Sequence, residues 1–169
     1  MDDQLSPDRS AEMVLGVREA VVDSSSVIYM LKAGFLERLA FDVKLWTPPE
    51  VITETGWRHL PLHVRPPSSS STGETAELTT DDRVLALAVE FRLPLVSEDR
   101  ELLMRAESAG LPYFNALMML ILLLGLGRCD RDELTIFWSR LVAVGHYSDR
   151  VGTFAEEVAS RVLLLTGRS

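Results

Sequence analysis

Short apolar segments alternate along the chain with longer segments whose apolar residues recur every three or four positions. The short segments predict buried strands, and the longer ones predict helices with one inward face. The predicted strands are 20–22, 43–46, 95–96 and 111–114. The predicted helices are 11–19, 27–35, 50–59, a central helix that begins at Thr80 and ends at Leu93 and Pro94, 101–109, 116–126, and two more capped by Asp130 and Ser148. This order is typical of α/β proteins with parallel strands, and we predict a three-layer α/β/α fold with a central, mostly parallel sheet.

The same pattern predicts how the chain is organised. Residues 1–19 are expected to form a tail and a short helix, 20–115 the α/β core, and 116–169 a helical extension packed on the same domain. A Pro- and Ser-rich loop is expected at 60–75. The apolar run 116–126 is about half as long as a membrane span requires, which favours a buried helix and no membrane partner.

The central helix has a distinctive first turn. Thr80 is expected to cap it, and Asp81 and Asp82 follow where the helix dipole favours negative charge. The apolar side chains expected to face inward are Val84, Leu85, Ala88 and Phe91.

Four acidic residues stand at comparable places in these elements. Asp23 follows the first strand, Glu54 lies in the helix after the second, Asp81 begins the central helix, and Asp99 follows the strand at 95–96. Each has an ordinary interpretation as well, because Asp23 and Asp99 are suitable helix caps, Asp81 suits a first turn, and Glu54 suits a solvated helix face. If the strands are parallel, Asp23 and Asp99 share the carboxyl edge of the sheet, where α/β proteins bind ligands.

Carboxylates that converge repel one another unless protons or a cation neutralise them. Mg²⁺ and similar hard cations take oxygen ligands from a few carboxylates and retain waters, and such an ion activates water for phosphate displacement. The pattern of acids therefore predicts a metal site suited to phosphodiester chemistry. A phosphatase of the haloacid dehalogenase type is disfavoured, because Ser25 stands where its second Asp is needed.

The ordered motifs resemble those of PIN-domain nucleases. The segment VVDSSSVI resembles the family's strand–Asp–Ser/Thr motif, and PEVITE resembles its Pro-x-Val-x-x-Glu motif. DDRVLALA resembles the Asp that precedes its apolar helix, and VSED resembles its Thr/Ser-x-Asp motif. The resemblance covers roughly residues 20–115, and the helices after Asn115 resemble those appended to bacterial PIN proteins.

This resemblance implies a metal-dependent endoribonuclease. Asp23, Glu54, Asp81 and Asp99 would bind Mg²⁺ or Mn²⁺ and so activate water against an RNA phosphodiester. The hydroxyls that orient these ligands would be Ser25 and Ser97. Asp82 is the alternative to Asp81, because it lies about a third of a turn away on the same helix. The candidate phosphate contacts are Arg58, Arg65 and Arg100.

Charge and cysteine content limit the remaining possibilities. The net charge of −8 disfavours a broad basic face for nucleic acid, and the single Cys129 excludes an intramolecular disulfide. The polar N-terminal segment is unlike a signal peptide, which is consistent with a cytoplasmic protein. His59 and His63 are separated by Pro61, so they do not form a zinc pair on one helix, and structural or RNA-rim roles stay open.

The resemblance also implies a homodimer and a possible antitoxin partner, as for the toxin of a toxin–antitoxin pair. The alternative interpretation is a non-catalytic module of the same fold that binds RNA or protein. The acidic composition, with no obvious basic groove, motivates that alternative.

Overall fold

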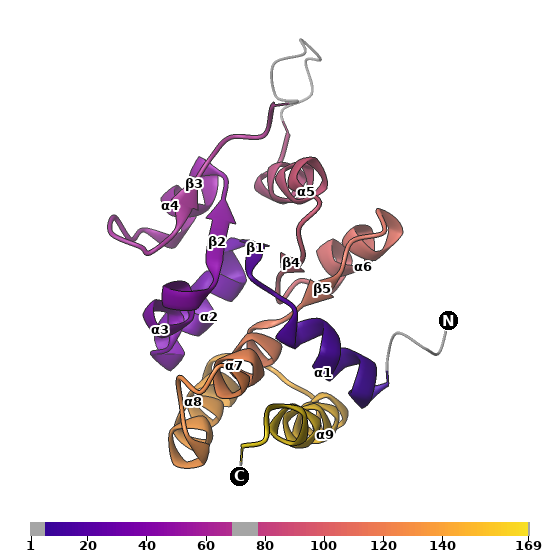
Figure 1. Ribbon diagram of the computed structural model, residues 1–169. Coiled ribbons are helices and arrows are strands. Elements are labelled where there is room, and N and C mark those ends of the chain that lie inside the picture. Colours follow the sequence, from indigo (N-terminus) through magenta and orange to yellow (C-terminus); the bar gives the residue numbers. More distant parts are fainter. Residues whose placement is uncertain (1–5, 69–77, 169) are drawn as a thin grey trace. The chain divides into compact units, whose positions relative to one another are not determined.

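The computed structural model describes residues 6–68 and 78–168. The chain divides into two compact units (Figure 1). The sheet unit comprises 18–28 and 40–115, and the helical unit comprises the described residues up to 17, then 29–39 and those from 116 onward. All four predicted acids belong to the sheet unit, so each unit is described by itself.

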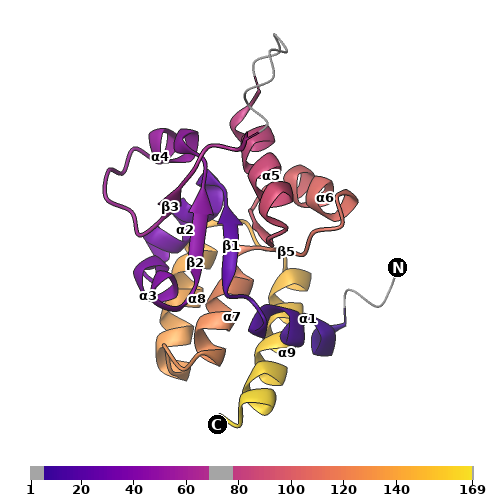
Figure 2. The same cartoon turned by 45° about the horizontal axis from the view of Figure 1, so that its top comes forward.

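Five strands form one parallel sheet in the order β3-β2-β1-β4-β5, which can be followed in Figures 1 and 2. The apolar residues of central β1 are fully buried. Val22 at its end is paired with Val96 in β4, so the two strands finish at the same level. The α/β class with a parallel sheet is thus confirmed. The strand bounds are Glu19–Val22 for β1, Lys44–Thr47 for β2, His63–Val64 for β3, Leu95–Val96 for β4 and Tyr113–Phe114 for β5.

The helices confined to the sheet unit are α4 (Pro49–Thr55), α5 (Thr80–Phe91) and α6 (Arg100–Ser108). Helix α4 ends earlier than predicted, because Gly56 adopts a left-handed conformation with φ 70°. Helix α5 is capped by Thr79 rather than Thr80, and a reciprocal pair of hydrogen bonds with Asp82 completes a capping box.

The inward face of α5 also differs from the prediction. Its buried residues are Val84, Leu87 and Ala88, whereas Leu85 and Phe91 are only partly buried. Leu87, three residues after Val84, packs inward, whereas Leu85, one residue after it, does so only in part. The buried stripe of α5 is therefore rotated slightly from the predicted one.

The predicted loop at 60–75 contains β3, whose two residues pair with Trp46 and Thr47. This strand was missed because two residues carry no periodicity. Residues 69–75 of that predicted loop lie outside the described residues.

Helices α2 (Ser24–Ala33) and α3 (Leu36–Asp42) replace the single helix expected at 27–35. Gly34 separates them with φ 91°, a conformation that side chains other than glycine rarely adopt. The carboxylate of Asp23, rather than a serine, accepts the first-turn N–H of α2 from Ser26.

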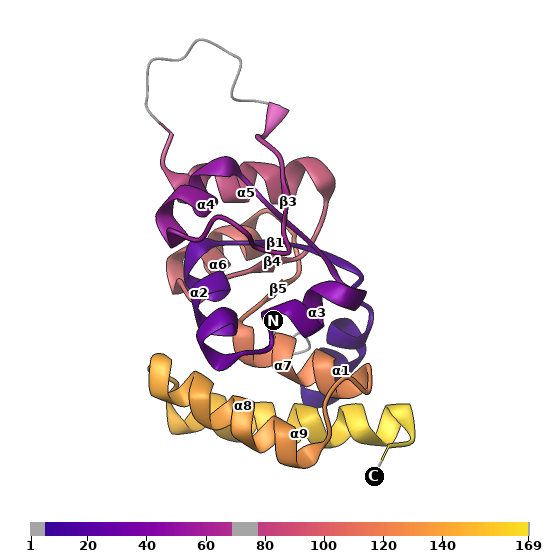
Figure 3. The same ribbon diagram turned by 90° about the vertical axis from the view of Figure 1, so that its left-hand side faces the viewer.

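The other helices of the helical unit are α1 (Pro7–Leu15), α7 (Ala116–Gly125), α8 (Arg131–Val144) and α9 (Asp149–Thr166). Helix α7 packs against α1, α8 and α9, and it is buried along nearly its whole length (Figure 3). Helix α1 begins at a Ser6 cap, earlier than predicted. Val142 of α8 and Val151 of α9 are exposed. Across 6–68 and 78–168, we find no helix with the length and apolar character of a membrane span.

Candidate functional site

Asp23 is the most buried of the predicted acids, with 4% of its surface exposed. Its Oδ1 accepts hydrogen bonds from the N–H and the hydroxyl of Ser26, at 2.8 and 2.6 Å. Its Oδ2 accepts from the hydroxyls of Ser25, at 2.7 Å, and Ser97. A buried carboxylate requires such partners, and here three serines supply them.

Parallel pairing of β1 and β4 brings Asp23 and Ser97 together. The N–H of Asp23 donates to the carbonyl of Val96 at 3.2 Å, which continues the β1–β4 ladder by one residue. Ser97 follows β4 directly, and its hydroxyl also accepts from the N–H of Asp99 at 2.9 Å. Both candidate acids that follow strands are therefore at the carboxyl edge of the sheet.

Asp99 is exposed and also has a structural role. Its Oδ1 accepts from the N–H groups of Glu101 and Leu102, at 2.7 and 3.2 Å, which caps α6. The ordinary interpretation of Asp99 as a cap is thus correct in part.

Asp81 lies in the electrostatic field of the other three acids. Partial burial is the largest cause that raises its pKa, and the charges of Asp23, Asp99 and Glu54 raise it further. The opposing charge of Arg105 is the weaker influence. These three carboxylates therefore lie close enough to Asp81, at the start of α5, to act on its charge.

The neighbouring Asp82 has a different environment. Its pKa is lowered, first by the hydrogen bond from Arg105 at 2.6 Å and then by hydrogen bonds from Thr79. Asp82 therefore completes the cap of α5 and an ion pair with α6, and Asp81 is the better candidate for the acid cluster.

Glu54 is held by the hydroxyl of Ser24 and by that of Thr80, a residue that the sequence analysis expected only as a helix cap. The hydroxyl of Ser24 donates to its Oε2, and that of Thr80 donates to its Oε1. Ser24 follows Asp23 and Thr80 precedes Asp81, so each lies next to a predicted acid in the sequence. These bonds connect α4 to the first residues of α2 and α5.

Two ion pairs hold α5 between its neighbouring helices. The Nε of Arg83 lies 3.3 Å from Glu50 of α4, and Arg105 of α6 contacts Asp82. Glu50 is one turn before Glu54 on the same helix. Its second oxygen, Oε2, is buried and has no hydrogen-bond partner in the described part of the chain.

The donor set fits a hard divalent cation. In the described residues, no three His, Cys, Asp or Glu side chains form a ready-made metal-binding group, and hydroxyls donate to the oxygens of Glu54 and Asp23. The charges that raise the pKa of Asp81 nevertheless act within one cluster, and a cation there would offset their repulsion. Only oxygen donors take part, as Mg²⁺ and Mn²⁺ prefer.

None of the three candidate arginines forms an ion pair with these four acids within the described ranges. Arg58 and Arg100 are exposed, after α4 and at the start of α6 respectively. Arg65 follows β3 and lies over the ring of Phe91.

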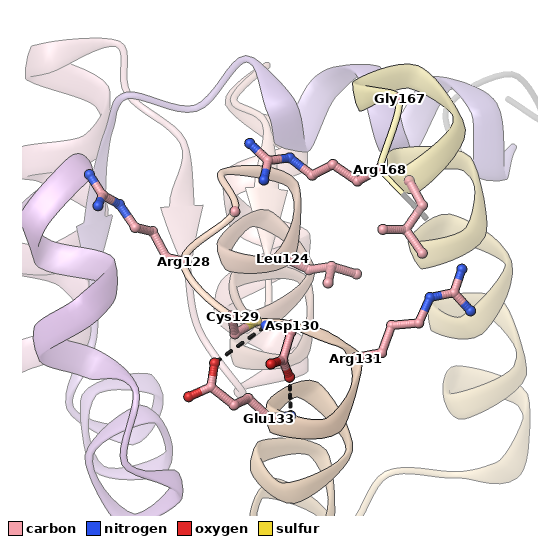
Figure 4. A pocket seen from close by; sticks show the side chains of 10 residues that line it. Leu124, Arg128, Cys129, Asp130, Arg131, Glu133, Gly167 and Arg168 are labelled. Atoms are coloured by element: carbon pink, nitrogen blue, oxygen red, sulfur yellow. Dashed lines mark hydrogen bonds between the residues drawn. The ribbon is translucent and has the colours of Figure 1, made fainter.

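A separate cavity of about 520 Å³ lies in the helical unit (Figure 4). Asp130 and Glu133 on its wall form the capping box of α8, so these acids are engaged locally. Burial, with the charge of Glu133, raises the pKa of the Cys129 thiol to about 11, which keeps it protonated and a weak nucleophile. The cavity therefore lacks the chemistry that the acid cluster offers.

Fold and site together define an α/β protein with four carboxylates at the carboxyl edge of a parallel sheet. Comparison with family models, with curated proteins and with solved structures gives no match to this chain.

Proposed function

We propose that this protein is a metal-dependent endoribonuclease of the PIN type. The observation that carries the proposal is the set of hydroxyls that links the acids: Ser97 bonds to Asp23 and to the N–H of Asp99, whereas Ser24 and Thr80, which adjoin Asp23 and Asp81, both donate to Glu54. Four acids from separate parts of the sequence act on one another at the edge where α/β proteins bind ligands. Their order along the chain supports the same assignment.

In this proposal Asp23, Glu54, Asp81 and Asp99 hold Mg²⁺ or Mn²⁺. A bound ion of this kind lowers the pKa of a coordinated water and offsets charge on a phosphate. Ser25 and Ser97 orient the Asp23 carboxylate through their bonds to Oδ2.

Two further hydroxyls position the remaining ligands. Ser24 and Thr80 each donate to one oxygen of Glu54, and each oxygen keeps a lone pair with which it would bind a cation. The ion pairs of Arg83 and Arg105 keep α5, and with it Asp81, in place between α4 and α6.

The proposed biological setting is a cytoplasmic homodimer that acts on RNA, with an antitoxin protein as a possible regulator. The competing function is a PIN-fold module that binds RNA or protein without cleavage. The hydroxyl-occupied oxygens of Asp23 and Glu54 favour that alternative, and the test below separates the two.

The decisive experiment measures Mn²⁺ binding by calorimetry and RNA cleavage for the wild type, Asp99→Asn and Asp82→Asn. Asn caps a helix about as well as Asp, so Asp99→Asn preserves α6 while it removes a charged ligand. We expect affinity for Mn²⁺ to fall about tenfold or more and cleavage to fall on the order of 100-fold in Asp99→Asn.

Asp82→Asn is the matched control. It removes the acid that follows Asp81 on α5, whose carboxylate bonds to Arg105 and lies outside the cluster. It should keep metal binding and cleavage. Equal cleavage by wild type and Asp99→Asn would overturn the nuclease proposal. RNA binding without cleavage in the wild type would favour the non-catalytic module.

A further inference from the structure

A second group of side chains gathers on one face of the sheet, at β2 and the edge strand β3. Leu45 and Thr47 of β2 are buried, whereas Lys44 and Trp46 point to the opposite face. Trp46 is paired in register with His63, and their ring centroids are 5.2 Å apart. Alternation along the strand thus places a cation, an indole and an imidazole side by side.

Two aromatic rings hold cations in place on this face. The Nζ of Lys44 lies 4.2 Å from the centroid of the Trp46 ring, and the guanidinium carbon of Arg65 lies 5.0 Å from that of Phe91. The two rings meet edge-on at 5.1 Å, so they form one support. Cations fixed in this way lose less side-chain entropy when they bind a ligand.

Lys44, His63 and Arg65 are all exposed, and we call them the cation strip. The acids beside it are engaged with other donors. Glu19 accepts from the indole N–H of Trp46 at 2.7 Å, and Glu90 accepts from the N–H and hydroxyl of Ser68, each at 2.7 Å. Arg65 is 3.8 Å from Glu90, at the limit of an ion pair. The strip thus presents two cations and an imidazole to solvent, with the carboxylates of Glu19 and Glu90 beside them held by neutral donors, on a protein whose net charge is −8.

The cation strip leads toward the acid cluster. Lys44 begins β2, whereas Arg65 follows β3 and its N–H donates to the carbonyl of Thr47, the last residue of β2. The strip therefore ends at the carboxyl edge of the sheet, two strands away from Asp23. Helix α5 connects the two sites as well, since Phe91 and Asp81 are ten residues apart, about 15 Å along the helix.

We infer that the cation strip binds the phosphate backbone of a single-stranded RNA whose chain continues to the acid cluster. A row of exposed, preorganised cations suits phosphate groups. Because this row is only as wide as one β-strand, it suits a single-stranded nucleic acid rather than a duplex. This inference rests on the proposed function for the nature of the polymer.

The test is the affinity of a fluorescein-labelled twelve-nucleotide oligouridine, measured by anisotropy in EDTA and in the Asp99→Asn background so that no cleavage occurs. The variant Lys44→Glu/Arg65→Glu should weaken binding about tenfold or more. The neutral pair Lys44→Gln/Arg65→Gln, which leaves both rings in place, should lower the slope of log K against log salt by about 1.4.

The matched control is Arg131→Glu/Arg150→Glu, which changes the net charge by the same amount on exposed helix positions elsewhere. Unchanged RNA affinity in the strip variants, or an equal loss in the control, would overturn the inference. Displacement of the RNA by polyglutamate as readily as by unlabelled oligouridine would overturn it too, in favour of an acidic protein partner.

Cleavage distinguishes the two proposals. In the otherwise wild-type protein, the strip variants should raise KM for long RNA and leave kcat unchanged. If neither the wild type nor the strip variants cleave RNA, but RNA binding still depends on Lys44 and Arg65, the nuclease proposal fails and the RNA-binding role of the cation strip is supported. If the strip variants cleave RNA normally and bind it as tightly as the wild type does, the RNA-binding role of the cation strip fails and the nuclease proposal is supported.

Discussion

At the scale of single residues, identical side chains acquire different properties from their surroundings. Asp81 and Asp82 are adjacent, yet burial and three nearby carboxylates raise the pKa of the first, whereas bonds from Arg105 and Thr79 lower the pKa of the second. The helix separates them by about a third of a turn, which is enough to direct one toward the acid cluster and the other toward α6. Opposite pKa shifts predict opposite effects on stability.

The first prediction compares Asp81→Asn with Asp82→Asn in the absence of metal. Because the folded-state pKa of Asp81 is raised, its contribution to folding is favourable only below about pH 3.8 and is lost as pH rises through the raised pKa. Asp81→Asn should therefore raise the Tm at pH 7, by an amount that shrinks toward pH 3.8.

Asp82 should behave in the opposite sense. Its lowered pKa means that it stabilises the fold above about pH 3.8 and that this is lost as pH falls through the lowered value. Asp82→Asn should lower the Tm at pH 7, and the difference should close at low pH. Thermal scans from pH 3 to pH 7 measure both. If both variants shift the Tm in one direction at pH 7, the two acids are not in different environments.

At the scale of elements, residues in the left-handed conformation follow helices α5 and α6. Helix α5 ends at Arg92, which has a left-handed φ of 53°, whereas α6 is followed by Gly110 with φ 72°. Both helices are thus followed by a residue in the left-handed conformation. This conformation strains Arg92 but is freely accessible to Gly110. Helix ends of this kind determine the spacing between the acids at one end of α5 and the ring of Phe91 at the other.

The second prediction is a reciprocal pair of substitutions at these ends. Arg92→Gly should raise the free energy of unfolding by about 0.5 kcal/mol, because relief of the left-handed strain exceeds the entropy that glycine adds to the unfolded chain. Gly110→Ala should lower it by about 1 kcal/mol, and only through backbone strain, since nothing lies within 4 Å of the added Cβ. Urea denaturation measures both, and a stabilising Gly110→Ala would contradict this account.

At the scale of the whole molecule, the helical unit presents apolar side chains to solvent. Leu164 and Leu165 of α9 are 72% and 56% exposed, and Ile136 of α8 is 50% exposed. Helix α7, in contrast, is buried by its neighbours and is the centre of this unit. Exposed leucines at the end of an otherwise amphipathic helix favour self-association.

The third prediction is a homodimer that depends on these leucines. Light scattering at micromolar concentration should give about twice the chain mass of 18.8 kDa. Leu164→Glu/Leu165→Glu should give the monomer mass, whereas Met104→Glu, an exposed apolar residue of the sheet unit, should leave the dimer intact. A monomeric wild type at this concentration would rule the prediction out.

The local pattern of the sequence was sufficient for the class of fold and for most elements. Short apolar runs identified β1 and β4, and apolar residues at three- and four-residue spacing identified α5, because burial requires apolar residues at those positions. The acids were also recognisable, since each follows or begins a predicted element. Short β3 was missed, because two exposed residues carry no apolar signal, and Gly34 was expected to end one helix rather than to separate α2 from a second helix, α3.

Only the tertiary structure decided which acids act on one another and which bond elsewhere. The sequence favoured Asp81 over Asp82 only by its interval to the apolar helix, whereas the physical distinction arises from Arg105 and Asp23, far away along the chain. It also could not reveal that Ser24 and Thr80 hold Glu54, or that Lys44 and Arg65 rest on rings from different elements. Periodicity reports which face of an element is buried, whereas contacts between polar side chains depend on how the elements are packed and on the register of the strands.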